Sequence, residues 1–274
     1  MEASFINVSG TKIAYIEKNS AEAKTIFFIH GNSGSSKTWR KQFQDELFKN
    51  YRLIAVDLPG HGESSKAANP KYTYSPIITA KILAEALQKL TENKPYFLVG
   101  FSYGTNLIAE MLPFINQPLG IVLSGACVVG AGYTADKVII NFESIFLQQT
   151  VEKLAAEKFL IEQLYNKNNL TLFVKDYYRT DPFFRTALLE NATEGNVSDE
   201  IKLLQEYPYE LLVITGDDDR LVNNQYIEHT GIRLWNHKAY RIEKAGHFVS
   251  NDQPEKFNLL LYDYISERII EASL

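Results

Sequence analysis

A single serine, Ser102, stands between two glycines in the segment Gly-Phe-Ser-Tyr-Gly at residues 100–104. The apolar run before it, residues 95–99, is short and rich in strand formers. After it, residues 106–115 place apolar side chains at helical spacing. A tight turn from strand to helix favours residues without side chains on both sides of the serine. The segment therefore predicts a strained turn that projects the hydroxyl of Ser102 out of a sheet.

Apolar runs typical of strands alternate with helical patterns along most of the chain. The runs at residues 24–29, 52–58 and 120–123 are almost continuously apolar, as expected of strands that are buried on both faces. Residues 77–90 carry the apolar stripe of an amphipathic helix. This alternation predicts an α/β protein with a mostly parallel sheet and helices on both faces. We also expect strands at 4–8, 12–17, 210–215 and 238–243, and helices at 37–48 and 254–270.

Residues 128–195 differ from the rest, because helical patterns such as 151–165 and 183–190 follow one another there without a clear strand. We therefore predict a first core segment at 1–127, a helical cap at 128–195 and a second core segment at 196–274. The aromatic side chains of the cap either line a substrate pocket or pack the cap onto the core, and packing is the more common role. These residues are Phe142, Phe146, Phe159, Tyr165, Tyr177 and Tyr178.

Composition excludes several kinds of partner. The 274 residues carry a net charge of −5, which argues against binding to nucleic acid. No apolar stretch approaches the roughly 20 residues that a membrane-spanning helix needs. The first residues lack the basic and apolar regions of a secretory signal. A single cysteine, Cys127, precludes an internal disulfide, so we expect a cytoplasmic protein.

A serine hydroxyl is a weak nucleophile unless a neighbouring base activates it and a third group orients that base. Of the five histidines, His247 directly follows an expected strand, at the edge where open α/β sheets bind ligands. The acidic turn at residues 217–219 also follows an expected strand and offers three aspartates. Loop position alone does not choose among them. The histidines lack the spacings of common metal motifs, and no phosphate-cradling loop is present, so we expect neither metal nor cofactor.

These segments, in this order, resemble the α/β-hydrolase superfamily along almost the whole chain. The family order of nucleophile, acid and base implies Ser102, Asp219 and His247 as the catalytic residues. The resemblance of residues 30–33 to the family's turn after the third strand implies that the backbone N–H groups of Asn32 and Tyr103 form an oxyanion hole. It also implies a turn-stabilising role for residues 57–64.

The implied chemistry is acyl transfer without a cofactor, and the expected partner is a small ester or lactone. Branches of the superfamily that open epoxides or cleave carbon–halogen bonds have an aspartate as the nucleophile. This chain has Ser102 at that position. Residues 30–33, 57–62 and 179–181 are similar to N-acyl-homoserine-lactone hydrolases, although that family has Leu where this chain has Tyr103. Three alternatives stay open on the same fold: a receptor with little turnover, a perhydrolase and a carbon–carbon bond hydrolase.

Overall fold

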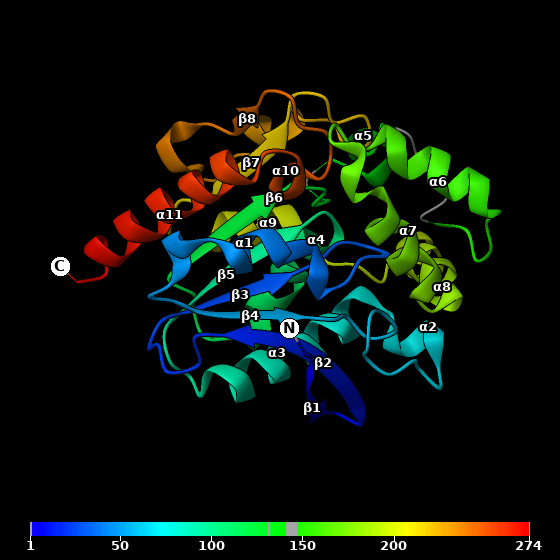
Figure 1. The fold of residues 1–274 in the computed structure, drawn as a ribbon, viewed down its shortest axis with the longest axis horizontal. Coiled ribbons are helices and arrows are strands. Elements are labelled where there is room, and N and C mark those ends of the chain that lie inside the picture. Colours follow the sequence, from blue (N-terminus) through cyan, green and yellow to red (C-terminus); the bar gives the residue numbers. More distant parts are fainter. Residues whose placement is uncertain (1, 131, 141–146, 274) are drawn as a thin grey trace.

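An eight-stranded sheet forms the centre of the protein, which a computed structural model describes at residues 2–130, 132–140 and 147–273 (Figure 1). The strand order is β1-β2-β4-β3-β5-β6-β7-β8. β1 and β2 pair antiparallel with each other, β2 pairs antiparallel with β4, and all further pairs are parallel. The strands are β1 Ser4–Val8, β2 Thr11–Lys18, β3 Thr25–Ile29, β4 Arg52–Val56, β5 Tyr96–Phe101, β6 Gly120–Ser124, β7 Leu212–Gly216 and β8 Tyr240–Ile242.

Helices cover both faces of the sheet. α3 (Pro76–Thr91), α4 (Tyr103–Met111) and α9 (Glu200–Glu206) pack together on one face. α1 (Arg40–Gln44), α10 (Val249–Asp252) and α11 (Pro254–Glu271) pack on the other (Figure 1). Every residue of β3, β5, β6 and β7 is buried between these layers, which explains why their sequences are continuously apolar. The predicted α/β architecture is confirmed.

A group of helices lies between β6 and β7 and projects from one end of the sheet (Figure 1). No strand longer than an isolated bridge occurs in its described part. The expected helices at 151–165 and 183–190 correspond to α6 and α8. The boundaries of a cap at 128 and 195 stay a prediction. In the described residues, the helices of this insert are α5 Ala135–Val138, α6 Lys153–Glu162, the 3-10 turn η5 Lys167–Asn169, α7 Leu170–Arg179 and α8 Pro182–Thr193.

The expectation of one helix at residues 37–48 was wrong. The segment consists of η1 (Ser36–Trp39), α1 and η2 (Glu46–Phe48). Asp45 interrupts it with an extended backbone, ψ 132°, and its side chain accepts a hydrogen bond of 3.0 Å from the N–H of Leu47. An aspartate that bonds to the backbone two residues ahead competes with a continuous helix and starts a new one instead. The remaining helices are α2 Pro70–Thr73, η3 Leu112–Phe114, η6 Tyr226–His229 and η7 Trp235–His237.

Candidate active site

Ser102 occupies the turn between β5 and α4 with φ 51° and ψ −123°, a conformation that non-glycine residues rarely adopt. Its N–H donates to the carbonyl of Ser124 on β6, over 2.9 Å. The glycines on either side allow close packing. A Cβ at Gly104 would lie 2.4 Å from the Ile29 carbonyl oxygen, and one at Gly100 would lie 2.7 Å from the Gly104 carbonyl oxygen. Close packing between β3, β5 and α4 thus holds the strained serine in place.

His247 and Asp219 meet at the carboxyl ends of the strands. The imidazole Nδ1 lies 2.8 Å from the Asp219 carboxylate oxygen Oδ2. The other oxygen, Oδ1, accepts hydrogen bonds from the N–H groups of Leu221 and Val222, at 2.9 and 3.0 Å. The side chains of His247 and Asp219 are 2% and 0% exposed. These contacts orient the carboxylate, which in turn accepts the Nδ1 proton and leaves Nε2 of the imidazole as an acceptor.

The imidazole of His247 is held from several sides. Its backbone N–H donates to the carbonyl of Gln163, in the insert, over 2.9 Å. The ring packs on that of Phe101, with 4.9 Å between the ring centroids. A Cβ at Gly125 would lie 2.9 Å from the imidazole Cε1. Within the described part of the chain, Nε2 has no hydrogen-bond partner, although it is buried, and the ring lines the same cavity as Ser102.

The other two aspartates of the acidic turn lie away from the histidine. Asp217 and Asp218 are exposed, and their backbone N–H groups donate to the carbonyls of Ile242 and Ala245. Of the three carboxylates that loop position left open, the structure therefore brings only Asp219 to the imidazole.

The two residues expected to form an oxyanion hole lie on either side of Ser102. Asn32 follows β3 and lines the cavity together with Ser102 and Tyr103. A Cβ at the preceding residue, Gly31, would lie 2.8 Å from the Cβ of Ser102, so this turn presses against the serine. Tyr103 is the first residue of α4. The N–H groups of a first helical turn lack partners within their helix and favour negative charge.

His30 and His61 brace the two turns through hydrogen bonds to their rings. The ring of His61 accepts from the N–H of Ser33 over 3.1 Å, and the ring of His30 accepts from the N–H of Leu58 over 3.1 Å. Burial lowers the pKa of both imidazoles, that of His61 strongly. Asp57 accepts from the N–H groups of Ser36 and Glu63. These bonds fit the turn-stabilising role expected for residues 57–64.

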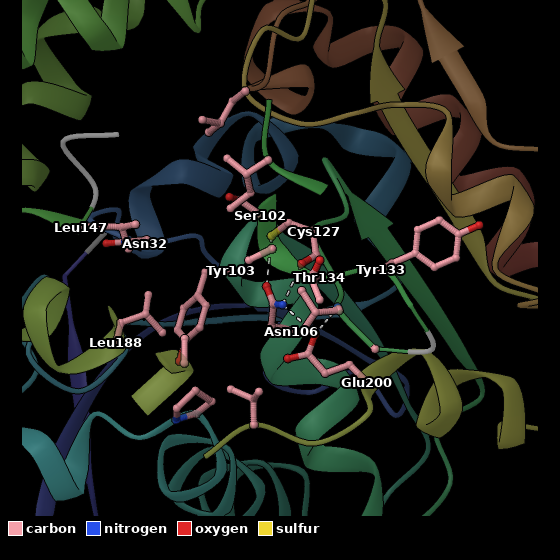
Figure 2. A pocket seen from close by; sticks show the side chains of 18 of the residues that line it. Asn32, Ser102, Tyr103, Asn106, Cys127, Tyr133, Thr134, Leu147, Leu188 and Glu200 are labelled. Atoms are coloured by element: carbon pink, nitrogen blue, oxygen red, sulfur yellow. Dashed lines mark hydrogen bonds between the residues drawn. The ribbon is translucent and has the colours of Figure 1, made fainter. Parts of the chain in front are cut away.

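A cavity of about 460 Å³ adjoins Ser102 (Figure 2). His247 also lines it. Such a volume is typical of sites for small molecules. The insert contributes mostly apolar side chains to its wall, including Tyr133, Leu147 and Leu188. The cavity therefore suits a small, largely apolar ligand.

The aromatic residues proposed for the pocket wall have other positions. Phe159 and Tyr177 are buried in the core cluster, while Tyr165 and Tyr178 are 49% and 46% exposed. None of these four lines the cavity, and packing is the role that the structure supports for Phe159 and Tyr177. Phe142 and Phe146 lie outside the described residues.

The polar residues of the cavity wall that were missed in the sequence include Asn106 and Glu200. Asn106 donates to a carboxylate oxygen of Glu200 over 2.7 Å and to the carbonyl of Cys127 over 2.9 Å (Figure 2). Burial raises the pKa of the Cys127 thiol to about 12, which keeps it neutral. Glu200 lies on the same helical face as the buried Leu204. A charged residue on an apolar helical face was the sequence signal that could have indicated the burial of Glu200.

No group of three or more His, Cys, Asp or Glu side chains among the described residues is arranged to hold a metal ion. None of the described helices combines the length and apolar character needed to cross a membrane.

Comparisons with known proteins agree with this architecture. Residues 24–254 match the protein family described as alpha/beta hydrolase fold. The uncharacterized hydrolase YugF of Bacillus subtilis is 25% identical over 268 residues, 94% of this chain and 96% of the relative. A 2-hydroxy-6-oxononadienedioate/2-hydroxy-6-oxononatrienedioate hydrolase of Paraburkholderia phymatum is 25% identical over 286 residues, 96% and 95% of the two chains.

Solved structures share the fold over nearly their whole length. A crystal structure of the N-acyl homoserine lactonase AidH has a TM-score of 0.90 at 23% identity and covers 98% of both chains. A Rhodococcus esterase has a TM-score of 0.81 at 25% identity, covering 97% of this chain and 99% of the esterase. The predicted α/β-hydrolase fold is therefore confirmed.

Proposed function

Because this chain belongs to the α/β-hydrolase fold family, we propose that it is a serine hydrolase that cleaves a small carboxylic ester or lactone through an acyl-enzyme on Ser102. One observation carries the proposal. The imidazole of His247 is bonded to Asp219 at Nδ1, and its unpartnered Nε2 belongs to the cavity that Ser102 also lines. A buried base without a partner in the described chain suits the transfer of a proton from a neighbouring hydroxyl.

In the proposed reaction, Ser102 Oγ attacks the substrate carbonyl carbon while His247 Nε2 takes the hydroxyl proton. Asp219 holds the imidazole in the required tautomer and stabilises the imidazolium. The backbone N–H groups of Asn32 and Tyr103 bind the oxyanion of the tetrahedral intermediate. The leaving alcohol receives the proton from His247, and water activated by the same nitrogen then releases the acid from Ser102.

The narrower candidate substrate is an N-acyl-homoserine lactone. Its support is the likeness to AidH, an N-acyl homoserine lactonase, together with a largely apolar cavity of about 460 Å³ beside Ser102. A simple ester is the broader candidate, and the likeness to the Rhodococcus esterase supports it. A single cysteine and a net charge of −5 support a cytoplasmic enzyme that acts on a small molecule rather than on nucleic acid.

The test compares p-nitrophenyl butyrate and hexanoate with N-butanoyl and N-hexanoyl homoserine lactone. We expect turnover of at least one of these classes, and a loss of about 10⁴-fold or more in Ser102→Ala. When the wild type is mixed with a substrate that is turned over slowly, mass spectrometry should detect an acylated Ser102. Equal rates in Ser102→Ala and the wild type would refute the proposal.

Carbon–carbon bond cleavage is the second candidate, because two relatives at 25% and 23% identity are hydrolases of 2-hydroxy-6-oxo acids. The compound to test is 2-hydroxy-6-oxo-6-(2'-aminophenyl)hexa-2,4-dienoic acid, after which one of these relatives is named. Cleavage of the carbon–carbon bond should remove the conjugated chromophore of this compound, so its absorbance should fall. If that compound is turned over and neither esters nor lactones are, the second candidate replaces the first.

A further inference from the structure

Glu200 is a buried carboxyl group in the wall of the cavity that Ser102 lines. It is the first residue of α9 and is 1% exposed. Its partner Asn106 lies on α4, four residues after Ser102, which is about 6 Å along the helix axis. The carboxyl group is therefore close enough to the serine for a single small substrate to reach both.

One oxygen of Glu200 is fully engaged. Oε2 accepts a hydrogen bond from the Asn106 side-chain amide, at 2.7 Å (Figure 2). It accepts a second one from the N–H of Val129, at 2.8 Å. Asn106 is itself fixed, because its carbonyl oxygen accepts from the Cys127 thiol over 3.0 Å. No group in the described chain bonds to Oε1 of Glu200. Oε1 is thus the atom of this carboxyl group that is available to a ligand.

The surroundings of Glu200 favour its neutral form. No lysine or arginine occurs among the described residues that line the cavity, and Glu200 is their single carboxylic acid. Burial, reinforced by the charge of Glu110, raises the pKa of Glu200 to about 8, against the opposing hydrogen bonds from Val129 and Asn106. At neutral pH the proton resides on Oε1, because Oε2 already accepts two N–H groups. The titratable groups that face Glu200 are Glu110, Asp199, Cys127, Tyr103 and Tyr226.

We propose that Glu200 determines specificity by donating a hydrogen bond from Oε1 to an oxygen acceptor on the substrate, so that the cavity selects acyl groups bearing a carbonyl oxygen over plain alkyl groups. This inference rests on the proposed function and names the substrate class. A plain alkyl chain leaves the buried O–H without a partner, a loss that corresponds to about 10- to 100-fold in kcat/KM.

The experiment measures kcat/KM for p-nitrophenyl hexanoate and for its 4-oxo and 5-oxo counterparts, between pH 6 and 9. Each oxo-to-alkyl ratio is divided by the same ratio for spontaneous hydrolysis, which removes differences in intrinsic reactivity. Any effect of pH on the catalytic residues that both substrates share cancels in the ratio. The variants are Glu200→Gln and Glu200→Leu, with Glu206→Gln, an exposed change on the same helix, as the control.

We expect a wild-type ratio of about 10 to 100 for at least one oxo position, falling above pH 8 as Glu200 loses its proton. Glu200→Gln keeps an N–H donor at all pH values, so its ratio should persist and lose the pH dependence. Glu200→Leu should bring the ratio near one, and Glu206→Gln should behave as the wild type does.

Two results would overturn the role of Glu200: a wild-type ratio near one at both positions, or a Glu200→Gln ratio that falls with pH as the wild-type ratio does. The second applies even if Glu200→Leu fails to fold. An inactive Ser102→Ala variant beside a wild-type ratio near one would refute the role of Glu200 alone.

Discussion

Replacing Asp219 with asparagine tests how the carboxylate controls the imidazole of His247. Oδ1 of Asp219 accepts two backbone N–H groups, from Leu221 and Val222, and Oδ2 accepts the Nδ1 proton of His247. Asparagine has one acceptor oxygen and one NH₂ group. Its oxygen will keep the two backbone bonds, because turning the NH₂ toward those N–H groups would sacrifice both of them.

The NH₂ group of Asp219→Asn then faces Nδ1 of His247 and donates to it. The ring must carry its proton on Nε2, which is the tautomer that cannot accept the proton of Ser102. A forced tautomer of this kind lowers kcat by about 10⁴-fold, equivalent to about 5.4 kcal/mol in the activation free energy. The fold should survive, since the shape of the side chain is preserved.

The assay is steady-state hydrolysis of the best ester or lactone, with thermal unfolding measured in parallel. Asp217→Asn is the matched control, because Asp217 lies in the same turn and is exposed. We expect its kcat to stay within about two-fold of the wild type. If Asp219→Asn keeps more than a tenth of wild-type kcat, the argument from the tautomer is refuted.

Two further changes test the packing of the serine turn and a buried acid in the insert. Gly104→Ala places a Cβ 2.4 Å from the Ile29 carbonyl oxygen, and this overpacking should lower the melting temperature by about 2–10 °C; an unchanged melting temperature would contradict the close approach. Burial raises the pKa of Asp176 from 3.8 to about 6, so the folded chain retains a proton that the unfolded chain releases between these pH values. The free energy of unfolding should therefore fall by at most about 3 kcal/mol as the pH rises through that window. Urea unfolding at pH 4.5 and pH 7 should show a smaller fall in Asp176→Asn than in the wild type, and equal falls would refute the assignment.

The sheet could be predicted from sequence because its central strands are buried on both faces. β3 and β6, for example, have no exposed residue, and their apolar runs mark them without any tertiary information. The interruption of the helix expected at 37–48 depended instead on one side chain. Asp45 accepts a hydrogen bond from the N–H of Leu47, and the spacing of apolar residues does not indicate such a local bond.

The site was only partly accessible to sequence reasoning. The positions of Ser102 and His247 after strands indicated which edge of the sheet they occupy. The choice among the aspartates at 217–219 depends on the direction of each side chain, and the loop sequence does not encode that direction in any simple pattern. Glu200 was missed because its partners Asn106 and Val129 are distant in sequence, so their contact exists only in the folded chain.

The carbonyl of Gln163 accepts the backbone N–H of His247, and this bond has a consequence for engineering. Asp181 likewise donates its backbone N–H to Gly60, and its carboxylate accepts from the hydroxyl of Tyr74. Grafting the helices between β6 and β7 from another protein would thus replace one bond that holds the backbone of His247 and two that hold Gly60 and Tyr74. A chimera that preserves these bonds should acquire the substrate preference of the grafted helices and keep its turnover rate. A chimera that loses these bonds should lose turnover as well.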